Sequence, residues 1–146
     1  MADPLNVAAG AITIVSLAYS SSRALYELIS TIHGSPSVFK DLSEEVITLN
    51  QILDTLRATL GDHASMMGNK QIAYLEAVDR TLQGCDIACQ DFKTKLEKLT
   101  ENSSDGKRSF RDGLKLSFQR KNINDFRMRI ASWKASLTLG LYVATL

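Results

Sequence analysis

Apolar residues recur at steps of three and four residues along most of this chain. The longest example lies between residues 72 and 99, where nine apolar residues keep this spacing: Ile72, Leu75, Val78, Leu82, Cys85, Cys89, Phe92, Leu96 and Leu99. Steps of three and four place side chains on one face of an α-helix, whereas a half-buried strand requires alternation. No long segment shows that alternation. The spacing therefore predicts an all-α fold in which each helix buries one face.

Turn-forming residues divide the first hundred residues into three expected helices. Pro4 suits the first turn of a helix, and Gly34 is typical of a helix end. Pro36 suits the start of a second helix, which Gly61 is expected to end. In that helix the apolar residues are Val38, Leu42, Val46, Leu49, Leu53, Leu56 and Leu60. The expected helices cover about residues 4–32, 36–60 and 69–99.

The remainder of the chain adds one or two helices. The polar residues 101–106 are expected to form a loop before a short basic helix with Phe110, Leu114 and Phe118 on its inner side. The final helix carries Ile123, Phe126, Ile130, Trp133, Leu137 and Leu141. A break or kink between the two is expected at Asn122 or Asn124. Because 146 residues with 45% hydrophobic content can bury one core, residues 1–146 are predicted to form a single up-and-down bundle of four to five helices.

The amino-terminal helix has no charged residue between Pro4 and Ser22. Its serines, threonine and alanines leave it too weakly apolar for a permanent transmembrane helix. We therefore expect a central helix that is buried on all sides in the resting protein. A helix without charge can also move from a protein core into lipid. The candidate membrane-inserting residues are Leu5, Val7, Ile12, Ile14, Val15 and Leu17.

Charge is divided unevenly along the sequence. Residues 1–106 hold 8 Lys/Arg and 14 Asp/Glu, whereas residues 107–146 hold 9 Lys/Arg and 2 Asp/Glu. The candidates for binding anionic lipid or a partner are Lys107, Arg108, Arg111, Lys115, Arg120, Lys121 and Arg127. Alternatively, these cations pair with acidic residues of neighbouring helices, such as Glu44, Glu45, Asp86 and Asp91. Nucleic acid is disfavoured, because no recognised binding module or aromatic stacking platform accompanies the charge.

Nothing in the sequence predicts catalysis or a metal site. Cys85 and Cys89 are the only cysteines, and neither they nor His33 and His63 have zinc-motif spacing. Phosphate-binding glycine loops and nucleophile elbows are also missing from the sequence. We expect no cofactor. The cysteines are expected to be small core side chains in a reducing compartment, and the amino terminus has no secretory signal.

Three sequence patterns together resemble the HeLo-like domain at the amino terminus of fungal STAND and NLR-type proteins. The first is the start Met1-Ala2-Asp3-Pro4-Leu5 with Val7-Ala8-Ala9-Gly10. The second is Leu82-Gln83-Gly84-Cys85 followed by Phe92, Leu96 and Leu99. The third is the ending Trp133-Lys134-Ala135-Ser136-Leu137-Thr138-Leu139, which is similar to the family's His-Lys-x-Ser-Leu-x-Leu pattern. The resemblance covers essentially the whole chain.

The resemblance implies an effector domain of programmed cell death, innate immunity or heterokaryon incompatibility. Such domains are expected to self-associate on activation, move from the cytoplasm to the plasma membrane and permeabilise it. A C-terminal NTPase, repeat or prion-forming module would follow in a longer protein. The alternative is a signalling adaptor that docks on partner proteins and never inserts its first helix.

Overall fold

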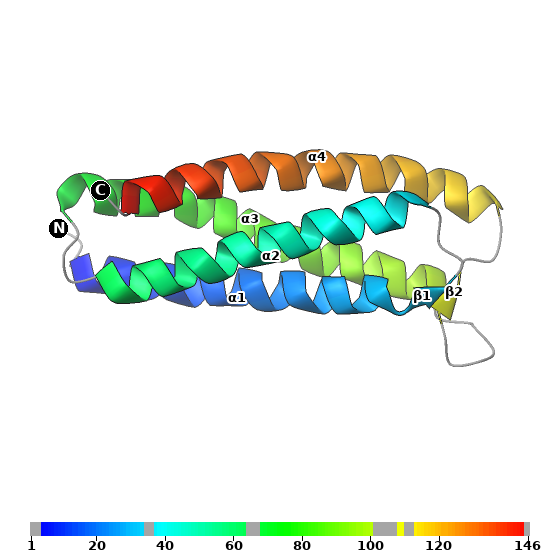
Figure 1. The fold of residues 1–146 in the computed structure, drawn as a ribbon, viewed down its shortest axis with the longest axis horizontal. Helices are drawn as coiled ribbons and strands as arrows, with labels where there is room; N and C mark the ends of the chain where they lie inside the picture. Colours follow the sequence, from blue (N-terminus) through cyan, green and yellow to red (C-terminus); the bar gives the residue numbers. More distant parts are fainter. Residues whose placement is uncertain (1–3, 34–36, 64–67, 101–107, 110–112, 145–146) are drawn as a thin grey trace.

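The computed structural model describes residues 4–33, 37–63, 68–100, 108–109 and 113–144, and within these ranges it contains four long helices. These are α1 (Pro4–Ser30), α2 (Ser37–His63), α3 (Asn69–Thr100) and α4 (Gly113–Ala144). Figure 1 shows them lying side by side along one long axis. The predicted all-α bundle is therefore confirmed.

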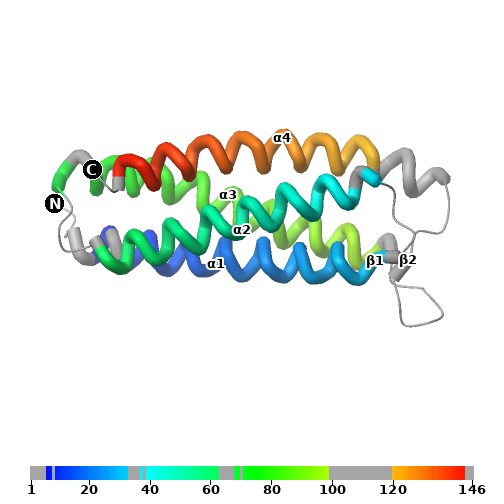
Figure 2. The backbone as a smooth tube through the Cα atoms, in the orientation of Figure 1, coloured from blue at the N-terminus to red at the C-terminus, as the bar shows by residue number. Residues whose placement is uncertain are grey.

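The four helices alternate in direction, as the colours of Figure 2 show. α1 packs against α2 and α3, and α4 packs against the same two helices. In Figure 1, α1 and α4 accordingly lie at the bottom and top of the view, with α2 in front and the fainter α3 behind. α1 and α4 are thus diagonal to one another, while each helix has two close neighbours.

The core contains the predicted apolar stripes. In α2 every expected residue from Leu42 to Leu60 is buried, and Phe39 joins them. In α3 the eight expected residues from Ile72 to Leu96 are buried, while the side chain of Leu99 lies outside the described part. The inner face of α4 buries Ile123, Phe126, Ile130, Trp133 and Leu137. Burying one face per helix is the general source of stability in such bundles.

The expected break at Asn122 or Asn124 is wrong, because α4 continues as one helix from Gly113 to Ala144. Asn124 is exposed and Asn122 is half-buried, so neither has to enter the core. Asparagine disfavours a helix by less than about 0.7 kcal/mol relative to alanine. The burial of Ile123 and Phe126 on either side is a much larger effect.

Two other helix ends also differ from expectation. α2 passes through Gly61 and ends at His63, and no atom would crowd a Cβ added at Gly61. α1 ends at Ser30 instead of about Ile32, where the Thr31 backbone amide and hydroxyl both donate to the Leu28 carbonyl oxygen. Gly34 and Pro36, the expected boundary residues, lie outside the described part.

A short parallel pairing that the sequence did not indicate follows α1. The two-residue strand β1 (Ile32–His33) pairs with β2 (Arg108–Ser109), with Ile32 opposite Arg108 and His33 opposite Ser109. Ile32 is buried and belongs to the core. In Figure 1 the pair lies at the end of the bundle opposite to the start of α1.

The prediction that α1 is central and buried on all sides is wrong. Its buried stripe (Ala11, Val15, Ala18, Ser22, Leu25 and Ile29) faces the core, but a second stripe faces outward. Lack of charge did not imply burial, because alanine, glycine, serine and threonine are readily accommodated at a protein surface. α1 is one of four helices that surround the core.

Candidate functional site

The outward stripe of α1 is the surface that most distinguishes this helix. Its exposed residues before Arg23 are Asn6, Ala9, Gly10, Thr13, Leu17 and Ser20. None of them is charged, and the Leu17 side chain is 48% exposed. We call these six residues the α1 stripe. A helix face of small uncharged residues allows close contact with another helix or with lipid.

The candidate membrane-inserting residues divide between this surface and the core. Leu17 is exposed, Val15 is fully buried, and Val7, Ile12 and Ile14 are half-buried against the core. The side chain of Leu5 lies outside the described part. Only a displaced α1 would therefore present the apolar set together. Within the described residues, the structure contains no helix that is both long and apolar enough to cross a membrane.

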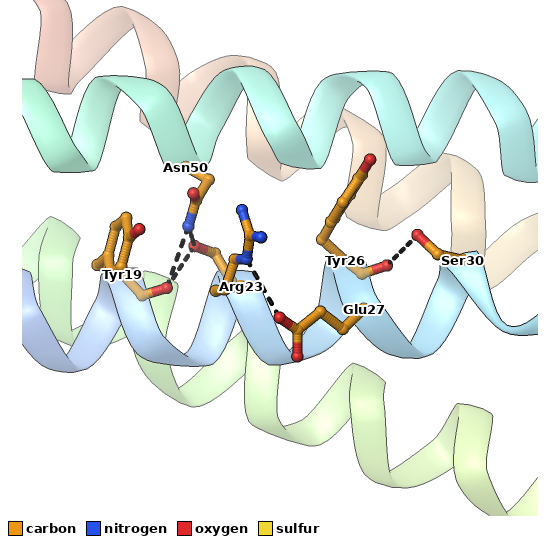
Figure 3. A network of polar contacts seen from close by, with 7 residues as sticks. Tyr19, Arg23, Tyr26, Glu27, Ser30 and Asn50 are labelled. Carbon is orange, nitrogen blue, oxygen red and sulfur yellow. Dashed lines mark hydrogen bonds and ion pairs between the residues drawn. The ribbon is translucent and has the colours of Figure 1, made fainter.

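Hydrogen bonds in the bundle interior connect α1 to α2. Asn50, on α2, is 4% exposed, and its Nδ2 donates to Ser22 Oγ at 2.8 Å and to the Tyr19 carbonyl oxygen at 3.2 Å. Ser22 is fully buried and donates to the same carbonyl oxygen at 3.0 Å. Figure 3 shows Asn50 directed from α2 toward Tyr19. Arg57 of α2 adds a cation–π contact, with its Cζ 4.4 Å from the centre of the Tyr19 ring.

A second polar contact connects α1 to α3 at the neighbouring residue. Ser21 Oγ donates to Asp86 Oδ1, and Gln90 Nε2 donates to the same carboxylate oxygen at 2.9 Å. Gln90 Nε2 also lies 3.4 Å from Ser21 Oγ. Adjacent serines of α1 thus bond to helices on opposite sides. We call Ser21, Ser22, Asn50 and Asp86 the α1 polar cluster.

Sequence reasoning did not identify the α1 polar cluster. Two signals were available. Asn50 lies four residues after Val46 and three before Leu53, so it falls on the apolar stripe of α2. A polar residue at such a position must find a hydrogen-bond partner in the core. The run Ser20 to Ser22 in the middle of a helix was the other signal.

The basic candidates are not gathered into one site. Arg120 and Lys121 are exposed on α4, whereas Arg127 is half-buried. Arg127 donates from Nε to Glu45 Oε1 and Oε2 at 2.9 and 3.0 Å, and from Nη2 to Oε1 at 2.7 Å. The hydrogen bonds to Glu45 raise the pKa of the Arg127 guanidinium. For Arg127, the alternative of pairing with a neighbouring helix is therefore confirmed.

The side chains of the remaining basic candidates lie outside the described part of the structure. Lys107 and Arg111 lie outside the described residues. Arg108 is described only by its backbone in β2, and Lys115 belongs to α4 with its side chain outside the described part. Of the acidic residues proposed as partners, Asp86 accepts hydrogen bonds from Ser21 and Gln90.

The cysteines are in the core, as predicted. Both are fully buried and free. The hydrogen bond with Cys89 and the burial raise the pKa of the Cys85 thiol. A thiol that stays protonated is a poor nucleophile and a poor metal ligand. Among the described residues, no three His, Cys, Asp or Glu side chains are grouped as a metal site requires.

Fold and surface together define a four-helix bundle domain whose first helix carries an uncharged outer face up to Arg23. Residues 2–146 match the family model described as "Pigment biosynthesis cluster protein PigL N-terminal". The chain therefore belongs to the PigL N-terminal family. No curated protein and no solved structure matches the chain.

Proposed function

We propose that this chain is a regulated effector domain of the HeLo-like type. In the resting state α1 is held in the bundle. On activation the domain self-associates and α1 acts on an anionic membrane. The family is named after the N-terminal part of a pigment biosynthesis cluster protein, which agrees with a module that precedes a second domain.

The observation that carries this proposal is the absence of charge on every face of α1 from Pro4 to Ser22. The surface of a soluble helix is normally rich in charged residues. In α1 both the core-facing residues, such as Val15, and the outward Leu17 can contact an apolar surface without burying a charge. Transfer to the membrane interface therefore avoids the several kcal/mol that a buried unpaired charge costs.

One part of the contact between α1 and the bundle is polar, and this part supports release. The α1 polar cluster replaces apolar packing with hydrogen bonds in the middle of the helix. A hydrogen bond contributes only about 0.5–1.5 kcal/mol net, because water replaces it when the groups separate. Release of α1 exposes core residues of α2 and α3, and self-association covers such surface again.

The test is binding and dye release with vesicles of phosphatidylserine and phosphatidylcholine, against vesicles of phosphatidylcholine alone. The domain is measured as it is and fused to a trimeric coiled coil that mimics activation. We expect leakage from the anionic vesicles, at least tenfold higher for the fused protein. Leu17→Glu is expected to abolish leakage, whereas Ile87→Glu, at a residue 59% exposed on α3, is the matched control. Absence of vesicle binding by the fused protein would refute the proposal.

The exposed cations are tested with the same vesicles. Each Lys or Arg near an anionic surface contributes about 1 kcal/mol. Arg120→Gln with Lys121→Gln should therefore weaken binding by about 2 kcal/mol, or roughly 30-fold. Equal binding of the double variant and the original would exclude these two residues from the membrane contact.

The alternative function is a signalling adaptor that docks on partner proteins. The pairing of Arg127 with Glu45 favours it, because one candidate for lipid contact is already paired with a carboxylate of α2. An adaptor keeps α1 in place. A disulfide or chemical cross-link between α1 and α3 would then leave partner docking unchanged, whereas it should stop vesicle leakage by an effector.

A further inference from the structure

α4 has apolar residues on two opposite faces. Its inner face enters the core through Phe126, Ile130 and Leu137. Its outer face carries Met128, Leu139 and Tyr142, which are 72%, 57% and 70% exposed. These are three of the five large hydrophobic side chains exposed in the described part of the chain. Exposed apolar residues that gather on one element indicate an interaction surface.

These residues belong to a regular stripe. From residue 131 to residue 142 the exposed positions of α4 are Ala131, Ser132, Ala135, Thr138, Leu139 and Tyr142, and none is charged. Together with Met128 they recur at steps of three and four, which is the spacing of a helix that packs along a second helix. We call Met128 and these six residues the α4 stripe.

The α4 stripe is complementary to itself when two copies run antiparallel. With a two-fold axis at Ala135, Met128 lies opposite Tyr142 of the second copy, and Ala131 lies opposite Leu139. Ser132 then lies opposite Thr138. Leu139 thus meets a small side chain, the large Met128 and Tyr142 meet one another, and two alanines meet at the centre. A two-fold interface requires this kind of self-complementary surface, and small central residues permit close packing.

Charge also favours the antiparallel arrangement. The exposed cations Arg120, Lys121 and Arg129 all precede the uncharged part of the α4 stripe. A parallel pair would place these cations next to their own copies. In the antiparallel pair the cations of the two copies lie at opposite ends of the interface. Ala144 of one copy is then level with Phe126 of the other, between Lys121 and Arg129. The last turn of α4 has no basic residue of its own, and cations stabilise a helix C-terminus.

We propose that the α4 stripe is a self-association surface through which two copies of this chain pair antiparallel, centred on Ala135. This pairing specifies how the self-association in the proposed function takes place, and its biological role rests on that function. The pairing itself is measured in solution without lipid. Because α1 lies diagonally across the bundle from α4, pairing through α4 leaves both α1 helices facing away from the interface.

Analytical ultracentrifugation of the chain from about 1 µM to 1 mM tests the pairing. We expect a monomer–dimer equilibrium. Leu139→Glu should weaken it at least 30-fold, because two carboxylates would be buried per dimer. Ile87→Glu is the control, since Ile87 is as exposed as Leu139 but lies on α3. If Leu139→Glu lowers the melting temperature, Met128→Glu repeats the test, because Met128 is the most exposed large apolar residue of the α4 stripe. A chain that stays monomeric, or that dimerises equally well in both stripe variants, would overturn the proposal.

Single cysteines test the register. A disulfide forms when two Cα atoms lie about 4.4–6.8 Å apart. Ala135→Cys should therefore cross-link to itself under mild oxidation. Met128→Cys alone should not, but a mixture of Met128→Cys and Tyr142→Cys should yield the mixed dimer. Cross-linking of Met128→Cys to itself would instead demonstrate parallel pairing and overturn the arrangement. The buried Cys85 and Cys89 remain in all variants.

Discussion

The two diagonal helices of the bundle, α1 and α4, contact their neighbours in different ways. α1 contacts α2 and α3 at mid-length through the α1 polar cluster. α4 contacts α3 through stacked aromatic rings, because Phe92 of α3 and Phe126 of α4 have centroids 4.4 Å apart. Within α4, Trp133 meets Phe126 edge-on at 5.7 Å. Apolar burial contributes most of the adhesion between helices, whereas hydrogen bonds mainly fix their register. The difference predicts that loss of one aromatic side chain of α4 costs more than loss of one side chain of the α1 polar cluster, although α1 also buries apolar residues such as Val15 and Leu25.

The largest effect is expected for Phe126→Ala. Phe126 is 4% exposed and contacts both other rings. Removal of a buried phenylalanine side chain costs about 3–5 kcal/mol, because it leaves a cavity in the core. Urea unfolding followed by circular dichroism measures the loss. A destabilisation below about 1 kcal/mol would mean that the aromatic contact is not the main attachment of α4.

A smaller loss is expected for the corresponding change in the α1 contact. Asn50→Ala should cost about 1–3 kcal/mol, because buried groups of α1 lose their partner. The double variant Asn50→Leu with Ser22→Ala removes both polar side chains. Its loss of stability should be much smaller than the summed losses of Asn50→Leu and Ser22→Ala measured singly. Additive losses in the double-mutant cycle would show that the two side chains do not act as a pair.

Gly140 permits the close approach of α4 to α3. A Cβ at this position would lie 3.1 Å from Val78 Cγ2 and 3.2 Å from Tyr74 Cε1. Gly84→Ala, where no atom lies within 4 Å of the added Cβ, is the matched control. The control should stabilise the bundle by about 0.5–1 kcal/mol through helix propensity. Gly140→Ala should give none of this gain. Equal melting temperatures for the two variants would contradict the close packing.

The smallest effect is expected for the pair Arg127 and Glu45. Both side chains are about one-third exposed, at 32% and 27%. Ion pairs accessible to solvent contribute about 0.2–1 kcal/mol and weaken in salt. A double-mutant cycle with Arg127→Gln and Glu45→Gln should give a coupling energy in this range. The coupling energy should decrease when the salt concentration is raised from 0.05 to 1 M. A coupling energy unaffected by salt would indicate a contact more buried than the geometry implies.

The regular parts of this fold follow from the sequence because burial is periodic. The stripes of α2 and α3 were predicted correctly from Leu42 to Leu60 and from Ile72 to Leu96, since only a helix places residues such as Leu42 and Val46 on one face, but the burial of Phe39 and Ala88 was missed. Helix ends were less predictable. Gly61 and Asn124 disfavour helix only weakly, and the packing of adjacent apolar residues is the larger effect.

The candidate site was predicted only in part. Absence of charge identified α1, but not which of its faces is exposed, because alanine, serine and threonine occupy core and surface alike. The hydrogen bonds from Asn50 to Ser22 and from Ser21 to Asp86 join residues 28 and 65 positions apart. Such partners depend on which helices become neighbours, and helical spacing alone does not specify that.

The pairing of β1 with β2 gives the bundle a direction in which it can open. β1 directly follows α1, and β2 directly precedes the segment that leads into α4. The C-terminal end of α1 is therefore joined to a second part of the chain, and among the described residues no such pairing adjoins its first turns. Separation of α1 from the bundle should start at Pro4 and proceed toward Ser30. Amide hydrogen exchange would then decrease steadily along the helix, with the α1 polar cluster as the midpoint of this gradient.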